Sequence, residues 1–353
     1  MNKICFLFAA IVMSLVFSSC RSMRIIEIET YSPSAISFPP EVKTVMIVNN
    51  SAQQLDKAGH RYMSNTKGDS LISVSADSTA YTFCMSLGKA IAESPLFVDV
   101  RICEDTLRRD SLFYDTKPLT VDDVNLFCNE YGVDALITLD KIFFNTTYYD
   151  KDMAFINGNV INVEISGELR ALWPGQKEAY KIPFQDSLTW VVDDVDYFYD
   201  NNIKVMFIQN DIRTTMLYIS EFVGNKIHSS VVPFWSEDKR WYYKSISSEW
   251  KYGAVCAAAE KWEEAEKRWE PLYNKAEKWK HKARLSSNLA LCNEMRGNFD
   301  KAAEYAEISY NLFKEHDKEG SPSISLQKAY IEVIEKRKQE DILLSKQLRE
   351  VDK

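Results

Sequence analysis

Four aspartates form the densest group of side chains in the sequence that could do chemistry: Asp193, Asp194, Asp196 and Asp200. Paired carboxylates can act as general acid and base, and grouped carboxylates can bind calcium. A calcium loop of the EF-hand type needs a glycine at its turn and a distal glutamate, and neither stands at the required spacing. We therefore interpret the group as a solvated turn before a helix, with a carboxylate site as the alternative.

Histidines and cysteines add no chemical constellation. The four histidines are scattered without metal-ligand spacing: His60, His228, His281 and His316. Five cysteines follow Cys20 without C-x-x-C spacing, and we interpret them as small core residues: Cys84, Cys103, Cys128, Cys256 and Cys292. No G-x-S-x-G elbow occurs. The sequence thus predicts no catalytic residues, no metal ligands and no cofactor, and we do not expect an enzyme.

Composition and charge argue against several classes of partner. The 353 residues carry a formal net charge of -8, which argues against a nucleic-acid or anionic-lipid partner. Glycine is scarce, at 11 residues, and no phosphate-cradling motif is present, which argues against a nucleotide. Hydrophobic residues make up 46% of the chain, a normal proportion for globular domains.

The N-terminus has the features of an export signal. An apolar run from Ile4 to Phe17 is too short to span a bilayer, which takes about 20 residues, but it fits the core of a signal peptide. The residues Val16-Phe17-Ser18-Ser19-Cys20 resemble the bacterial lipobox, in which a peptidase cuts before a cysteine that carries a diacylglyceryl group. An ordinary secretory signal is the alternative. We expect a signal peptide over 1–19, lipid attachment at Cys20, and an anchor and linker over 20–38.

The residues after Cys20 bear on which membrane the protein reaches. In lipoprotein sorting an aspartate at the next position retains the protein at the inner membrane, and this position is Arg21. The acidic run that sends some lipoproteins to the cell surface is absent. The resemblance therefore implies an outer-membrane lipoprotein of the cell envelope that faces the periplasm, held by the lipid on Cys20.

Residues 39–246 read as an α/β (or α+β) domain with a mixed sheet. Three apolar runs predict strands over 42–48, 96–102 and 133–143, and the intervening periodic segments predict helices over 79–93 and 120–132. Thr120 to Asp123 resembles a capping box. Asn157-Gly158 and Trp173-Pro174-Gly175 predict hairpin turns of an antiparallel extension, and 203–223 predicts a long helix that Gly224 ends. We expect a surface loop from 49 to about 77.

Residues 247–353 read as an all-α array of helical hairpins. Residues 252–265 and 289–302 repeat at an offset of 37, and the second copy resembles the tetratricopeptide (TPR) pattern at Leu289, Ala290, Gly297, Phe299 and Ala302. Trp262 and Phe299 should begin the second helix of each copy, while Glu260 stands where the turn glycine belongs. A generic pair of helical hairpins is the alternative. A final capping helix is expected over 324–350.

The TPR resemblance implies a concave groove lined by the first helix of each repeat. By position, the residues that would face it are Trp250, Arg284, Ser287, Leu291 and Glu294. Two repeats make a shallow groove, so these residues either bind a partner or pack within the chain. A second candidate surface is the aromatic group Phe234, Trp235, Trp241 and Tyr242, which could stack on sugar rings or pack at the junction of the two domains.

The whole arrangement is similar to an uncharacterised family of Gram-negative (Bacteroidales-type) lipoproteins with an N-terminal α/β domain of unknown function and C-terminal TPR repeats. The residues that carry this similarity are the lipobox, the segments 38–50 and 131–140, and the repeat pair. This resemblance implies no known activity.

Five hydroxyl residues follow an aspartate and precede an aliphatic residue or threonine. This pattern resembles the acceptor sites of a general O-glycosylation system in some Gram-negative bacteria, and the candidates are Ser70, Ser78, Thr106, Ser111 and Ser187. Helix caps and Asx turns are the alternative explanation.

Taken together, these features predict a membrane-anchored periplasmic lipoprotein without enzymatic activity. We expect it to act as an interaction or assembly factor that docks another envelope protein through its TPR-like repeats. The alternative is a carbohydrate-binding or glycan-processing accessory protein that uses the aromatic group.

Overall fold

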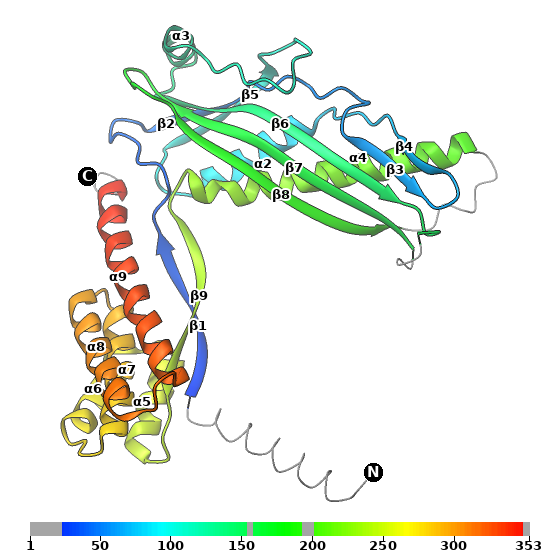
Figure 1. Cartoon of the computed structure of the whole chain (residues 1–353). Helices are drawn as coiled ribbons and strands as arrows, with labels where there is room; N and C mark the ends of the chain where they lie inside the picture. The colour runs from blue at the N-terminus through cyan, green and yellow to red at the C-terminus, as the bar shows by residue number, and fades with distance from the viewer. Residues whose placement is uncertain (1–22, 154–157, 193–200, 349–353) are drawn as a thin grey trace, which may run out of the picture. The chain divides into compact units, whose positions relative to one another are not determined.

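A computed structural model describes residues 23–153, 158–192 and 201–348, which form two compact units. The first, here the sheet unit, comprises the described residues of Pro33–Phe234 and residues 346–348. The second, here the helical unit, comprises residues 23–32 and Trp235–Ser345. The fold class predicted from the sequence is confirmed, since a mixed sheet with helices is followed by a run of helices (Figure 1).

The sheet unit is built on one seven-stranded mixed sheet. Its strands are β2 (Thr44–Asn49), β3 (His60–Ser64), β4 (Gly68–Leu71), β5 (Asp99–Thr106), β6 (Ala135–Tyr149), β7 (Asn159–Leu172) and β8 (Tyr180–Val192). The order β4-β3-β6-β2-β5 forms the main path, and β7 pairs with β6 and β8. Strand β2 runs parallel to β5 and β6, whereas β6, β7 and β8 are antiparallel.

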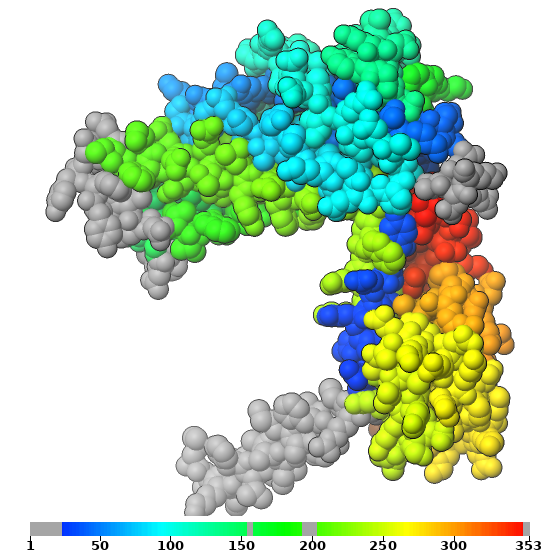
Figure 2. All heavy atoms as spheres, turned by 180° about the vertical axis from the view of Figure 1, so that it is seen from behind, coloured from blue at the N-terminus to red at the C-terminus, as the bar shows by residue number. Residues whose placement is uncertain are grey.

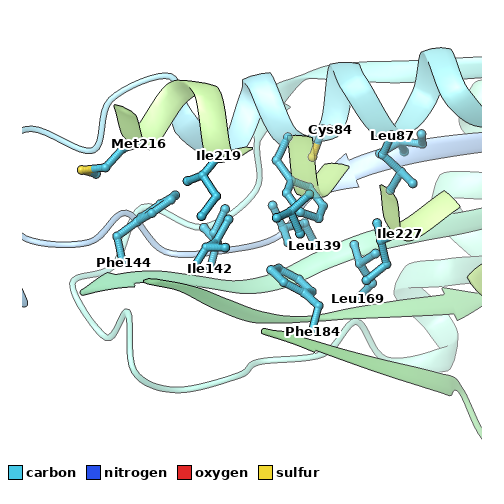
Figure 3. Packing of buried hydrophobic residues seen from close by; sticks show 14 of the residues in the cluster. Cys84, Leu87, Leu139, Ile142, Phe144, Leu169, Phe184, Met216, Ile219 and Ile227 are labelled. Carbon is cyan, nitrogen blue, oxygen red and sulfur yellow. The ribbon is translucent and has the colours of Figure 1, made fainter. Parts of the chain in front are cut away.

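Alternation along β2 places its side chains in two separate cores. Val45 and Ile47 face the larger core, which α2 (Thr79–Ala92) and α4 (Asn201–Lys226) cover. Met46 and Val48 face a smaller core against α3 (Val121–Tyr131). Figure 2 shows α2 in cyan beside α4 in lime green, and Figure 3 shows the larger core, where Leu139 and Phe184 from the sheet meet Leu87 and Ile219 from the two helices.

The helices predicted for this unit are confirmed in position, and residues at the ends of α3 explain where that helix begins and ends. Helix α3 begins with the predicted capping box, because the hydroxyl of Thr120 accepts from the Asp123 amide and the Asp123 carboxylate accepts from the Thr120 amide. Gly132 ends it in the left-handed region, with φ at 60°. The prediction that Gly224 ends α4 is wrong. The helix continues to Lys226, and a Cβ on Gly224 would lie 2.5 Å from the Phe83 carbonyl oxygen, so this glycine lets α4 approach α2 closely.

Two segments expected to be irregular form strands. The stretch expected to be a surface loop from 49 to 77 contains β3 and β4. Its inward positions on β3 are His60, Tyr62 and Ser64, which are mostly polar and so hid the alternation. The expected linker over 20–38 contains β1 (Met23–Ser32), which pairs with β9 (Phe234–Tyr243) in a two-stranded sheet.

Five helices make up most of the helical unit: α5 (Ser248–Ala258), α6 (Trp262–Asn274), α7 (Trp279–Met295), α8 (Phe299–His316) and α9 (Pro322–Leu348). As predicted, Trp262 and Phe299 begin the second helix of each repeat. Small residues bring the helices together: a Cβ on Gly253 would lie 2.3 Å from Nε1 of the buried Trp269. In this unit β1 lies beside β9, and the two ribbon arrows run in opposite directions (Figure 1).

The two repeat turns differ in one testable way. Gly297 has φ at 74° and Glu260, at the matching position, has φ at 58°. A residue with a Cβ is strained in this left-handed region, whereas glycine is not. Replacing Glu260 with Gly should therefore raise the free energy of unfolding by about 0.5–1 kcal/mol, measured by chemical denaturation. Gly297→Ala is the matched control and should lower it; equal effects of the two changes would contradict the strain.

Candidate functional site

The predicted groove residues lie on α5 and α7 and are covered by the unit's own β9 and α9. Trp250, Ser287, Leu291 and Glu294 are at most 3% exposed. Arg284 alone is half-buried. The structure therefore brings the predicted residues together, but as an internal interface, and a partner cannot reach four of the five. Of the two alternatives that the sequence left open, the burial of these residues agrees with packing within the chain and not with a partner groove, because a strand that precedes the repeats fills the groove.

Strand β9 lies against α7 much as an extended peptide would. The side-chain amide of Asn288 makes two hydrogen bonds to the backbone of Tyr243: Oδ1 accepts from the Tyr243 amide at 2.7 Å, and Nδ2 donates to its carbonyl at 2.9 Å. Nε1 of Trp250 donates to the same carbonyl at 2.7 Å. These side chains satisfy the hydrogen-bonding groups of the Tyr243 backbone. A buried backbone amide or carbonyl without a partner would cost free energy. Sequence reasoning selected Trp250 but missed Asn288.

A buried ion cluster holds β9 and α9 onto α7. The Glu294 carboxylate lies 2.9 Å from Nη2 of Arg240 on β9 and 2.9 Å from Nη1 of Arg337 on α9. It also accepts a hydrogen bond of 2.7 Å from the Tyr330 hydroxyl. Burial, and then the negative charge of Glu294, raise the pKa of Tyr330, so it stays a neutral donor. Gln327 adds contacts of 3.3 Å to Ser287 and to the Tyr243 hydroxyl.

The four residues of the predicted aromatic group lie in different surroundings. Trp235 is 68% exposed and packs beside Tyr31 of β1, with ring centroids 4.9 Å apart. Trp241 packs on Tyr330 of α9 at 5.0 Å, and Tyr242 is buried. Phe234 is half-buried and lies 6.3 Å from the ring of His228 in the sheet unit. The four residues therefore do not form one sugar-binding platform.

Two family models match the chain on either side of the start of α5. Residues 42–243 match "Domain of unknown function (DUF8603)", which covers more than half of the 353 residues. The chain belongs to the DUF8603 family. Residues 251–336 match "Domain of unknown function (DUF6340)". No curated protein matches the chain.

Solved structures add no functional information. A solved structure titled "Crystal structure of uncharacterized protein" is 14% identical over 52% of this chain and 99% of that chain, with a TM-score of 0.19. A similarity of this size supports no argument about the fold or function of this chain.

The DUF8603 match ends at Tyr243, the last residue of β9. In the structure, however, residues 235–243 belong to the helical unit, where β9 fills the groove of the DUF6340 region. The strand is therefore matched by one family model and held by residues matched by the other. Strand β9 thus packs on the DUF6340 region, although the DUF8603 model matches its sequence.

Several predicted sites lie outside this groove. Cys20 and the aspartates at 193, 194, 196 and 200 fall outside the described residues. The five hydroxyl residues predicted as glycosylation acceptors are all exposed: Ser70, Ser78, Thr106, Ser111 and Ser187. Thr106 accepts a hydrogen bond of 3.1 Å from Asn49, and Ser78 makes no side-chain cap to α2. Capping therefore does not account for Ser78.

The later cysteines behave as the sequence predicts. Cys84, Cys103, Cys128 and Cys292 are buried, Cys256 is half-buried, and all five are free thiols. Burial raises the pKa of Cys84 to about 12 and that of Cys128 to about 11, so neither forms a thiolate at neutral pH. Within the described residues, no group of three or more histidine, cysteine, aspartate or glutamate side chains could hold a metal ion.

The sheet unit has a cavity that the sequence did not indicate. It measures about 490 Å³ and lies where β2 and β5 end and α2 begins, between Ser51, Thr79 and Arg109. Crevices at the carboxyl ends of parallel strands are common ligand sites in α/β folds. Arg108, which also lines this cavity, is committed to Asp110 and to two backbone carbonyls, so its charge is already neutralised.

Proposed function

We propose that this protein is an outer-membrane lipoprotein, attached through the lipid on Cys20 and facing the periplasm. In this proposal it has no enzymatic activity and acts as an interaction or assembly factor through its TPR-like helical unit. The lipobox-like segment supports the attachment, and the paired helical hairpins with small residues at their crossings support the TPR-like assignment. Among the described helices, none is long and apolar enough to cross a membrane.

The observation that carries the proposal is the route from Cys20 to the groove. Strand β1 begins at Met23, three residues after Cys20, and pairs with β9. Strand β9 is in turn held in the groove by Asn288, Trp250 and Glu294. A lipid on Cys20 would therefore be joined to the helical unit through hydrogen-bonded structure. This connection suits a module that presents a docking surface close to a membrane.

The same geometry supports one docking position for the partner that we propose. The groove is filled, but among the described residues β9 is the one strand that pairs with β1, so no described strand lies along the outer edge of β1. An extended segment of another protein can add to such an edge, with backbone hydrogen bonds supplying affinity. We therefore place the partner of the helical unit at the outer edge of β1, beside the repeats rather than inside their groove.

Lipid attachment is tested by replacing Cys20 with Ser. The native protein should have an intact mass that exceeds the peptide from residue 20 by three acyl chains and glycerol. It should also stay in the membrane fraction, because three chains hold a protein on a membrane essentially permanently. The variant should carry no lipid, and it should keep residues 1–19, because lipidation precedes cleavage. Cys256→Ser is the matched control and should be lipidated normally. A lipidated Cys20→Ser protein would contradict the proposal.

Glycosylation of the five exposed hydroxyl residues remains a separate proposal. The same intact-mass measurement bears on it, because sugar adds mass beyond the peptide and lipid. Their exposure satisfies the first requirement of an acceptor site. A mass equal to peptide plus lipid would end this proposal and leave the lipoprotein proposal intact.

Sugar binding by the aromatic group is kept as the alternative function on one observation. On the β1–β9 ribbon the exposed Trp235 packs beside the half-buried Tyr31. Stacking on sugar rings uses such faces. Trp235→Ala should abolish binding to a glycan array if this alternative holds, whereas the absence of any glycan binding by the unaltered protein would remove it.

A further inference from the structure

The helical unit has an open hollow of about 810 Å³ between the start of β1, the end of β9 and the outer side of α5. Four cationic side chains line it: Arg24, Lys244, Lys251 and Arg284. No aspartate or glutamate is among its lining residues. We call this surface the basic hollow. In Figure 2 the blue atoms of β1 lie beside the yellow-green and yellow atoms of the region that contains it.

Exposed apolar side chains stand next to these cations. Ile246 is 91% exposed and Val255 is 66% exposed, and both line the basic hollow. Single exposed apolar residues are normal on protein surfaces. Large aliphatic side chains ringed by lysine and arginine are instead typical of surfaces that lie in the interface of a membrane, with the cations at the headgroups.

Two of the lysines that line the basic hollow are available to bind an anion. Within the described part of the chain, neither Lys244 nor Lys251 forms an ion pair, and both are exposed. Other lysines of the same unit are paired with carboxylates, as Lys267 is with Glu263 and Lys301 with Glu266. Uncompensated positive charge on an acidic protein indicates an anionic partner for this one surface.

If Cys20 is lipidated, the short chain between Cys20 and Arg24 keeps the basic hollow near the membrane. Four residue steps separate Cys20 from Arg24, and a fully extended chain covers at most about 3.6 Å per residue, or about 14 Å in all. The Cα atom of Arg24 would therefore stay within about 14 Å of the Cα atom of Cys20, which is close to the phosphates of the same leaflet. A protein partner would have to compete for this space with the membrane itself.

We propose that the basic hollow is a lipid-contact site that rests on the anionic phospholipid surface around the anchor. This inference rests on the proposed lipidation of Cys20. Lys244, Lys251 and Arg24 contact headgroup phosphates, and Ile246 and Val255 enter the interface. The site orients the helical unit on the membrane, so that the outer edge of β1 is presented in one direction.

The net charge of the whole chain did not reveal this basic surface. A net charge of -8 argues against anionic lipid when it is averaged over the molecule. The four cations, however, come from positions 24, 244, 251 and 284, and only the pairing of β1 with β9 and the packing of α5 gather them.

The test uses the acylated protein reconstituted into vesicles. An environment-sensitive fluorophore is placed at Ile246→Cys in a Cys256→Ser background, since the remaining later cysteines are buried. Vesicles contain phosphatidylcholine alone or with phosphatidylglycerol. The fluorophore should be shielded from an aqueous quencher in phosphatidylglycerol vesicles and less so in phosphatidylcholine or at high salt. A fluorophore at Ile342→Cys, on α9, should remain accessible.

Charge reversal gives the decisive comparison. Each basic side chain near an anionic surface contributes about fivefold to the binding equilibrium, so Lys244→Glu with Lys251→Glu should reduce the ratio of shielded to accessible fluorophore by at least about 25-fold. Thermal unfolding should not change, because both side chains are exposed and unpaired. Equal accessibility of position 246 in all vesicles, or shielding only when an acidic protein is added, would overturn the inference. Protein that does not remain with the vesicles at all would instead show that the anchoring at Cys20 is wrong.

Discussion

Replacing Glu294 with Ala is expected to lower the free energy of unfolding of the helical unit by about 3–5 kcal/mol, the usual cost of removing one partner from a buried ion pair. The Glu294 side chain is 0% exposed, and that of Arg240 is 6% exposed. Without the carboxylate, the guanidinium of Arg240 would stay buried and keep only its 3.5 Å ion pair with the exposed Asp238. Chemical denaturation followed by circular dichroism, which reports the helices, measures the effect.

A matched surface change separates burial from charge. Glu263→Ala removes an exposed pair with Lys267 on α6, and exposed pairs of this kind contribute little to stability. Replacing both Glu294 and Arg240 with apolar residues should recover part of the lost stability, because the guanidinium of Arg240 is then removed together with its partner. Arg337 also loses its partner, but its side chain is less buried, at 18% exposed. A Glu294→Ala effect no larger than that of Glu263→Ala would contradict the role of the ion cluster.

Acid should destabilise the sheet unit through His60. This side chain is 0% exposed, with Nδ1 at 2.8 Å from the Thr146 hydroxyl. Burial, partly opposed by the charge of Asp56, lowers its pKa from 6.5 to about 4. Between these values the unfolded chain binds a proton that the folded chain does not, so stability falls as the pH decreases from about 6.5 to about 4. The loss should reach about 3 kcal/mol.

His60→Asn is the control for this effect. Asparagine places a polar atom near the position of Nδ1, so contact with Thr146 is kept while the titrating group is removed. The variant should lose about 3 kcal/mol less stability than the unaltered protein between pH 6.5 and pH 4, because this part of the pH dependence comes from one proton. Identical pH profiles for the two proteins would show that His60 is not the responsible group.

Local patterns predicted much of the architecture. The runs over 42–48, 96–102 and 133–143 gave strands because their alternating or continuous apolar residues match buried parallel strands. The capping box at Thr120 and the aromatic starts of the second repeat helices depend on residues three or four apart, which the sequence displays directly.

Non-local pairing set the limit of prediction. Strands β1 and β9 are separated by about 200 residues of chain, and neither pattern specifies its partner. The groove residues on α7 were identified from TPR spacing, yet what fills the groove depends on that distant pairing. Asn288 and Arg240 acquire their roles only when β9 lies against α7. The same pairing gathers the basic hollow, which composition alone argues against.

Strand β9, which the DUF8603 model matches, stabilises the helical unit. It closes the groove of the repeats through backbone bonds to Asn288 and charge pairing to Glu294. It also pairs with β1, which follows Cys20 in the chain. In our account β9 is a built-in ligand that stabilises the repeats and leaves the edge of β1 as the docking surface.

The most direct test of this account is site-specific photocrosslinking in the native host. A photoreactive residue replaces Glu29, which is exposed on β1, and in a matched control it replaces Glu130, which is exposed on α3. The account predicts one stoichiometric adduct with an envelope protein at position 29 and none at position 130. No adduct at position 29, or the same adducts at both positions, would contradict a docking function for the helical unit.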